Sequence, residues 1–463
     1  MTLISRLQRY WKAVTARISP SSSPDSSKAG STADDAGQGG GRRSRRRGRR
    51  GGGGRDRPDG GEAETSGQGQ RPSRRGGHHE ARDRARGERG PQPAEAEFTY
   101  VDTQDGLAGL LDHLQGQTLI AIDTEADNLH HYETRVCLIQ VSAGGRQFIV
   151  DPLAGIDLAP FFDLLAQKSL LMHGSDYDLR LLWDLTKFRP AEVFDTMLAA
   201  QLIGRERIGL ASLLEEYLGI HHPKDSQKAD WSRRPLPPKM LNYAAGDVAH
   251  LFEIHRILTD ELTRLGRLDW HRQKCRWQID VATVGFPEEN VHAWRIGPSR
   301  GMSPRALAAL YELWHWREAE AKRLDRPPFK VMSNDYLAKL ALAVADGSHR
   351  EVYERLPNGL RRGPSRGLLE TLERGLERDP KSLPRRDTRG PRPDPLDAEE
   401  LARQDRIKSH RDKVAHELQI DATLIASRSQ IAQLCRAPAE ADKVLQPWQV
   451  DLLRPVLESF VAQ

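Results

Sequence analysis

The hydrophobic and polar positions divide the chain into three segments of different character. Between residues 19 and 97, large apolar residues are almost absent, and Ser, Gly, Pro, Arg and Gln dominate. Such a segment cannot bury enough apolar surface to offset its loss of chain entropy, so we expect it to be disordered. Short apolar runs alternate with amphipathic stretches over residues 98–265, whereas beyond about residue 297 the pattern is helical throughout.

The middle segment begins with three predicted strands. Apolar runs follow one another at hairpin distances, separated by turn residues such as Gly144 and Gly145, and occupy residues 119–122, 136–141 and 147–150. After them the pattern predicts strands at 169–173 and 192–194 and helices at 158–165, 176–185, 196–203, 210–218 and 238–265. A three-strand meander followed by βα units predicts an α/β domain, in which helices cover the faces of a mixed sheet.

An internal repeat organises the helical segment. The pattern of residues 316–340 recurs at 411–434, and each copy is long enough for one small helical bundle. We therefore predict two all-α domains, at 298–378 and 395–461, separated by a connector rich in Pro and Arg.

The N-terminal residues combine basic charge with little apolar content. Residues 1–18 place their apolar side chains on one helical stripe among basic residues. This pattern is typical of an interfacial helix, of a helix that docks on a partner and of a transit peptide, and all three interpretations stay open. Arginines far outnumber acids between Arg42 and Arg89, so we expect the tail to contact RNA or an anionic surface. The alternative is a solvated extension that aids solubility.

The cysteines and the longest apolar runs indicate the compartment. Cys137, Cys275 and Cys435 lie far apart and form no CxxC pair. This spacing excludes a zinc ribbon and a disulfide framework, and it suits a reducing compartment. No apolar run approaches the roughly 18 residues that span a bilayer. We therefore expect a cytoplasmic protein without a membrane-spanning segment.

Acidic residues in three separate parts of the middle segment are the candidates for chemistry. Asp123 and Glu125 lie two residues apart at the end of the first predicted strand, so both carboxylates are on the same face. Asp178 lies at the start of a predicted helix, while Tyr243 and Asp247, four residues apart, share one side of another helix. A cluster of carboxylates is costly unless cations neutralise it, which favours oxygen-binding metals such as Mg²⁺ or Mn²⁺.

The same residues resemble the three exonuclease motifs of the DEDD superfamily. The motifs are Asp123-Thr124-Glu125, the segment 173–179 and Tyr243-Ala244-Ala245-Gly246-Asp247, whose tyrosine is typical of the DEDDy branch. Segments 195–200 and 230–236 are similar to ribonuclease D, and the C-terminal repeats resemble helicase-and-RNase-D C-terminal (HRDC) domains. The resemblance covers residues 98–461, in the domain order of bacterial ribonuclease D.

The resemblance implies a ribonuclease H-like sheet and hydrolysis of RNA from its 3′ end with two metal ions. Asp123 is expected to bridge two Mg²⁺ or Mn²⁺ ions, Glu125 and Asp247 to complete one site, and Asp178 to reach the other. Tyr243 is expected to orient the attacking water, because a phenol with a pKa of about 10 is a poor base at neutral pH. The implied substrates are RNAs with a single-stranded 3′ end, such as tRNA precursors.

Other side chains are candidates for supporting roles. Trp231 and Arg234 are expected to line the substrate cleft, with a packing tryptophan as the alternative. His173 is expected to be a structural hydrogen-bonding residue, since Mg²⁺ prefers oxygen ligands. The remaining histidines near the motifs are expected in exposed loops: His130, His131, His221 and His222.

Three other interpretations stay open at this point. Residues 126–132 resemble Werner-type exonucleases, so a 3′-5′ DNA exonuclease with the same site chemistry is one alternative. The second is a non-catalytic RNA-binding scaffold, which the presence of all four acids disfavours. In the third, the main function is that of the tail, which tethers the nuclease to a membrane or to a degradosome-like assembly.

Overall fold

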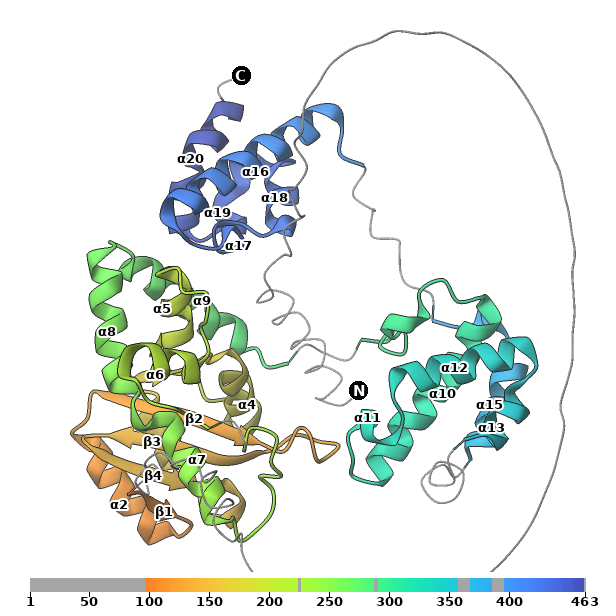
Figure 1. The fold of residues 1–463 in the computed structure, drawn as a ribbon, viewed down its shortest axis with the longest axis horizontal. Helices are drawn as coiled ribbons and strands as arrows, with labels where there is room; N and C mark the ends of the chain where they lie inside the picture. The colour runs from red at the N-terminus through yellow and green to blue at the C-terminus, as the bar shows by residue number, and fades with distance from the viewer. Residues whose placement is uncertain (1–96, 224–225, 287–289, 357–366, 385–394, 462–463) are drawn as a thin grey trace, which may run out of the picture. The chain divides into compact units, whose positions relative to one another are not determined.

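The computed structural model describes residues 97–223, 226–286, 290–356, 367–384 and 395–461 (Figure 1). The helix predicted at residues 1–18 and nearly all of the predicted disordered tail lie outside these ranges. Within them, no helix has the length and apolar content needed to cross a membrane.

A six-stranded mixed sheet forms the centre of the first described part. Its order is β1-β4-β3-β2-β5-β6, and the strands are β1 (Thr99–Val101), β2 (Leu119–Ala126), β3 (Val136–Ala143), β4 (Arg146–Val150), β5 (Ser169–Met172) and β6 (Glu192–Asp195). Strands β2, β3 and β4 pair antiparallel, whereas β5 and β6 continue the sheet parallel to β2. The predicted meander followed by βα units is confirmed.

Helices cover both faces of this sheet. Apolar side chains of α2 (Gln104–Gln115), α3 (Ala159–Leu165), α4 (Asp176–Thr186) and α9 (Leu268–Ala282) share one core with the strands. On the other face lie α7 (Pro238–Ala249) and α8 (Leu251–Arg264), where Ala244 packs with Cys137 and Leu138 of β3. Figure 1 shows α7 lying across β2, β3 and β4. Because all eight residues of β3 are buried, this strand is covered on both sides.

The structure differs from the sequence prediction in three places. The run 238–265 is divided at His250, whose φ of −115° and ψ of 12° leave helical geometry. Strand β1 and helix α2 were not predicted, although α2 buries a regular leucine stripe. Helix α9 lies beyond residue 265, and Ile279 and Ala282 join the core beneath the sheet. The short helices α5 (Thr196–Leu202) and α6 (Leu210–Leu218) agree with their predicted positions.

The remaining described residues are helical, as predicted. The first helical part contains α10 (Pro304–Arg323), α11 (Pro328–Val331), α12 (Asn334–Asp346), α13 (His349–Glu354) and α15 (Leu368–Glu377). The second contains α16 (Ala398–Leu418), α17 (Ala422–Ile425), α18 (Arg428–Leu434), α19 (Ala441–Val444) and α20 (Pro447–Val461). Both parts begin with a long helix, a four-residue helix and a third helix with a serine N-cap, Ser333 or Ser427. This shared order is the structural form of the repeat seen in the sequence.

Candidate active site

The acids of the first motif lie on the central strand β2. The strand extends to Ala126, so Asp123 and Glu125 lie within it, two residues apart on one face. Asp123 pairs with Gln140 of β3, and the first part of β2, up to Ala121, also pairs with β5. The sheet therefore holds both carboxylates on a rigid support.

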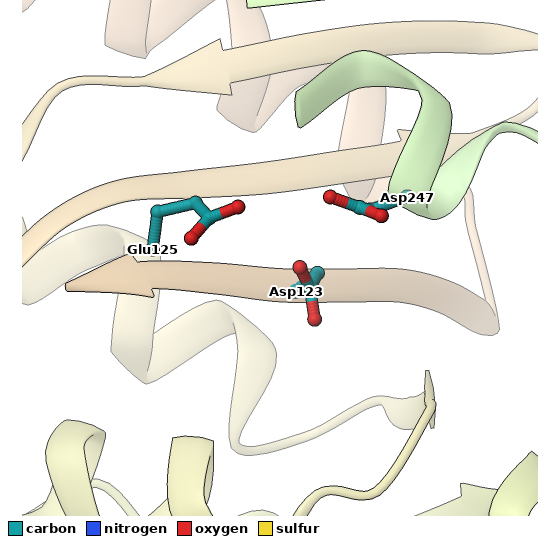
Figure 2. Close-up of side chains that lie close together, drawn as sticks. All are labelled: Asp123, Glu125 and Asp247. Carbon is teal, nitrogen blue, oxygen red and sulfur yellow. The ribbon is translucent and has the colours of Figure 1, made fainter. Parts of the chain in front are cut away.

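Helix α7 brings the third acid to the same place. Asp123, Glu125 and Asp247 each offer a carboxylate oxygen, and these three oxygens lie within 4.8 Å of one another. Figure 2 shows the Asp123 and Glu125 side chains on the strand and Asp247 on the helix above it. The helix is seated by Ala244, Ala245 and other apolar residues that pack on the sheet.

Asp178 adjoins this group from helix α4 without belonging to it. The hydroxyl of Thr124, the residue between the two acids in the sequence of β2, donates a hydrogen bond of 2.5 Å to Asp178 Oδ1. Asp178 also raises the pKa of Asp123, as expected for two carboxylates held close together. Its side chain is 8% exposed. The four predicted acids are thus brought to one region of the domain, three of them in a single ligand group.

Burial and mutual repulsion keep these acids from ionising easily. Burial, followed by the charges of Asp178, Asp247 and Glu125, raises the pKa of Asp123 well above its usual range. Burial, followed by the charges of Asp247 and Asp178, raises the pKa of Glu125. Burial raises the pKa of Asp178 to about 7 against the opposing hydrogen bond from Thr124. Among the described residues, no lysine or arginine forms an ion pair with Asp123, Glu125 or Asp178. An all-oxygen donor set with raised pKa values and no protein cation fits a hard divalent ion.

Tyr243 lies one helical turn before Asp247 and is only 7% exposed. Burial first, and then the charges of Asp247, Glu125 and Asp123, raise the pKa of its phenol far above 10. The phenol therefore stays protonated at neutral pH and acts as a hydrogen-bond donor. It cannot accept a proton from water in this state.

His173 has the structural role expected for it. Burial lowers its pKa to about 4, so the ring is neutral at pH 7. Its Nδ1 lies 2.9 Å from the Thr196 hydroxyl, and that hydroxyl donates in turn to the Met172 carbonyl. The ring therefore donates from Nδ1, which joins the end of β5 to the start of α5.

Trp231 and Arg234 make packing and anchoring contacts before α7. Trp231 is 1% exposed, and its ring centroid lies 6.1 Å from that of Tyr243, so the indole packs near the tyrosine. The Arg234 guanidinium donates two bonds of 2.6 Å to Asp151 and further bonds to the carbonyls of Trp231 and Cys137. Trp231 thus has the packing role given as the alternative, and a contact of Arg234 with substrate stays a prediction.

The loop histidines also differ from expectation. His222 is nearly buried, and its Nε2 lies 2.8 Å from Asp247 Oδ1, with side-chain exposures of 9% and 10%. His130 and His131 are half-buried and hydrogen-bond to the Lys228 carbonyl and the Ser232 hydroxyl. Only His221 is exposed as predicted.

Two supporting residues near Asp178 were missed in the sequence. Asp195 accepts hydrogen bonds from the backbone N–H groups of Gly174 and Ser175, in the turn just before α4. Gln278 of α9 donates to Asp195 and to the Ser175 hydroxyl. These bonds fix the turn that presents Asp178. The only available signal was the N-cap pattern at Asp195, because Gln278 is more than eighty residues away in the chain.

Comparison with known proteins identifies the family. A family model described as 3′-5′ exonuclease matches residues 98–263, and an HRDC domain model matches residues 306–345. A curated ribonuclease D from Gluconacetobacter diazotrophicus is 30% identical over 357 residues, which cover 75% of this chain and 89% of that protein. The chain belongs to the ribonuclease D family. A ribonuclease D from Acidiphilium cryptum is 31% identical over 370 residues, covering 78% of this chain and 92% of that protein.

Solved structures agree with membership of the ribonuclease D family. Escherichia coli RNase D, described as an exoribonuclease involved in structured RNA processing, aligns with a TM-score of 0.57 and 26% identity. The alignment covers 79% of this chain and 99% of that one. A protein from Bifidobacterium adolescentis shares the fold at a TM-score of 0.66 and 23% identity, over 80% of this chain and 98% of that one. The chain is thus a 3′-5′ exoribonuclease of the ribonuclease D type, a metal-dependent hydrolase with an HRDC domain.

Proposed function

We propose that this ribonuclease D removes nucleotides from single-stranded RNA 3′ ends at the carboxylate cluster of β2, α4 and α7. The observation that carries the proposal is the group of three ligand oxygens within 4.8 Å of one another, on Asp123, Glu125 and Asp247. Burial raises the pKa of all three, and for Asp247 it outweighs the opposing hydrogen bond from His222. Divalent cations, Mg²⁺ or Mn²⁺, are the partners that such a site requires.

The four acids would together provide the ligands for two ions. The charges of Asp178, Asp247 and Glu125 all raise the pKa of Asp123, so Asp123 lies close to each of the other acids. This central position would suit a ligand shared by both ions. Glu125 and Asp247 would complete one site with it, and Asp178 would reach the other directly or through water. When bound, two such ions activate a water molecule and stabilise the leaving 3′-oxygen.

Tyr243 positions the attacking water through its phenol. Because its pKa is raised far above 10, the O–H group can donate a hydrogen bond but cannot remove a proton. Trp231 packs against its ring and keeps it in place. The role of this tyrosine is therefore orientation of the nucleophile.

The substrate proposal is RNA with a free single-stranded 3′ end, with tRNA precursors as the main class. A duplex end would have to unpair before its last phosphodiester bond could reach acids that are half-buried or buried. The helical parts, the second of which we take to be a further HRDC-like domain, and the arginine-rich tail would hold the structured body of such an RNA through its phosphates.

Digestion of matched substrates tests this function. We expect 5′-labelled single-stranded RNA to shorten stepwise from its 3′ end with Mg²⁺ or Mn²⁺ and to stay intact in EDTA. Matched single-stranded DNA should be digested more slowly. Faster digestion of DNA than of RNA would favour the Werner-like alternative. RNA binding without digestion under any metal condition would favour the scaffold.

The tail contributes a separate, sequence-independent affinity for RNA. Deletion of residues 1–96 should leave turnover of short oligonucleotides nearly unchanged, because all of the motif residues lie beyond this point. It should weaken binding to long RNA and make that binding less dependent on salt, since fewer counterions are released. An unchanged salt dependence would show that the tail does not contact RNA.

A further inference from the structure

The loop between α6 and α7 places a histidine directly against one acid of the cluster. His222 Nε2 lies 2.8 Å from Asp247 Oδ1, and the two side chains are 9% and 10% exposed. When Asp247 is ionised, as a metal ligand must be, its carboxylate only accepts, so the imidazole N–H is the donor in this bond. The ring also lies beside Tyr243, with 5.4 Å between the ring centroids. His222 therefore contacts both functional residues of α7.

Helix α7 is shaped to receive this ring. Gly246 lies inside the helix, where a Cβ atom would be 3.1 Å from His222 Cε1 and 3.5 Å from Nδ1. The first distance is shorter than ordinary van der Waals contact, so with an alanine the ring would have to shift by a few tenths of an ångström. Glycine weakens a helix interior relative to alanine. Its presence next to Asp247 is explained by the room that it leaves for His222.

We propose that His222 is a positioning residue for metal binding, which donates a hydrogen bond to Asp247 Oδ1 and leaves Oδ2 directed to the ion. The proposal rests on the proposed function of the cluster. Carboxylates that ligate metals are commonly held by such outer hydrogen bonds, and their loss typically costs about 10–100-fold in metal affinity or activity. Without this bond the Asp247 side chain can rotate away from Asp123 and Glu125.

A cavity beside His222 allows the proposal to be tested by chemical rescue of a variant that lacks the imidazole ring. His221 and His222 line a cavity of about 540 Å³ together with Arg207, Ser212 and Glu215. Replacing His222 with alanine joins the space of the lost ring to this cavity. Free imidazole could then enter and restore the hydrogen bond to Asp247.

The test compares Mn²⁺ binding by the full-length wild-type protein and by His222→Ala, in the absence of RNA. Calorimetry and the melting temperature with and without Mn²⁺ provide readouts that do not depend on catalysis. We expect His222→Ala to bind Mn²⁺ about 10–100-fold more weakly. Imidazole should restore binding to this variant without affecting the wild type. His221→Ala, which alters the same cavity wall without touching Asp247, is the matched control and should bind Mn²⁺ normally.

Two further variants distinguish positioning from a purely structural role. His222→Gln carries a donor at a similar distance along the side chain and should keep most of the affinity. Gly246→Ala should weaken Mn²⁺ binding in the wild type by displacing the ring, and should have no further effect in the His222→Ala background. These variants also provide the test if His222→Ala does not fold.

The results separate this inference from the proposed function. If the wild type binds Mn²⁺ and digests RNA while His222→Ala binds Mn²⁺ equally well, the positioning role is overturned and the function stands. Equal losses in the alanine and glutamine variants without rescue by imidazole would also overturn it. If the wild type itself neither binds Mn²⁺ nor digests RNA, the proposed function fails.

Discussion

Two groups of acidic residues in the same domain have opposite electrostatic surroundings. Asp195 accepts hydrogen bonds from Gly174, Ser175 and Gln278, and these donors lower its pKa even though burial alone would raise it. The carboxylates of β2 have few such donors, and burial together with their acidic neighbours raises the pKa of both Asp123 and Glu125.

Asp151, like Asp195, is a buried acid surrounded by hydrogen-bond donors, and the two form the first group. Burial opposes its ionisation, but bonds from Arg234 and Tyr100 lower its pKa below the usual value. The difference teaches how structural and functional acids can be told apart in one fold. Where the protein supplies donors, the carboxylate holds the structure together, and where it supplies further acids, the neutralising partner must come from solution.

The largest effect on RNA digestion is expected from removing a central acid of the second group, which consists of the cluster acids Asp123, Glu125, Asp178 and Asp247. Asp123→Asn should reduce RNA digestion by about 10³–10⁴-fold or more, because several kcal/mol of metal-dependent stabilisation is lost. Its melting temperature in EDTA should not fall, since the repulsion among the acids is relieved. Mn²⁺ should stabilise it much less than the wild type. Asp163→Asn, at an exposed position on α3, is the control, and full activity in Asp123→Asn would contradict the assignment.

Removing only the phenol hydroxyl should have the next largest effect on the reaction. Tyr243→Phe keeps the packing on Trp231 but loses the donor to the water, so kcat should fall by about 10²–10⁴-fold. RNA affinity and Mn²⁺ dependence should remain close to wild type. Activity within twofold of wild type at saturating RNA would refute the role. Altered metal dependence would instead mean that the phenol supports the ion site.

A substitution of the arginine that pairs with Asp151 should affect the stability of the fold rather than metal binding. Arg234→Ala leaves the Asp151 carboxylate, whose side chain is 5% exposed, without its main partner. Loss of one partner from such a pair typically costs about 3–5 kcal/mol, which denaturant unfolding can measure. Arg234→Lys should recover only part of this, because it cannot make the paired bonds to Asp151. If both variants unfold like the wild type while RNA binding is lost, Arg234 is a substrate contact.

The pH dependence of stability should have opposite signs in the two groups. The folded-state pKa of Asp178 is raised to about 7, so its contribution to stability is fully present below about pH 4 and is lost as the pH rises through 7. For Asp195 the folded-state pKa is lowered, so its contribution is present above about pH 4 and is lost on acidification.

Asp178→Asn isolates the first of these contributions, because asparagine can still accept the bond from Thr124. In EDTA at pH 8 the variant should be more stable than the wild type, by on the order of 2 kcal/mol, and this difference should shrink as the pH falls and disappear near pH 4. Unfolding curves at the two pH values measure it. A difference that is independent of pH would mean that Asp178 ionises normally in the apo protein.

The sequence was sufficient to predict where the acids lie, but not which residues surround them. The spacing of Asp123 and Glu125 along a strand, and of Tyr243 and Asp247 along a helix, follows from local periodicity and was confirmed. The meander of β2, β3 and β4 was readable for the same reason. Local patterns determine which face of a strand or helix a side chain occupies, and this information was nearly enough to predict the positions of the acids.

Contacts between distant segments could not be predicted in this way. The bond from His222 to Asp247 depends on the path of a loop that has no regular pattern. Gln278 reaches Asp195 only because α9 packs beside β6, and no local pattern predicts this packing. For Trp231 the residue type fits packing and RNA contact equally well, and only its 1% exposure decides between them.

Calorimetric titration of the full-length protein with Mn²⁺ at pH 6.5, in two buffers of different ionisation enthalpy, tests the central claim most directly. If the acids with raised pKa values hold the metal, binding must displace protons, and the apparent enthalpy will differ between the buffers. Asp123→Asn should remove most of this binding, while Asp163→Asn should not change it. Mn²⁺ binding that is equally tight in Asp123→Asn, or that releases no protons in the wild type, would contradict the account.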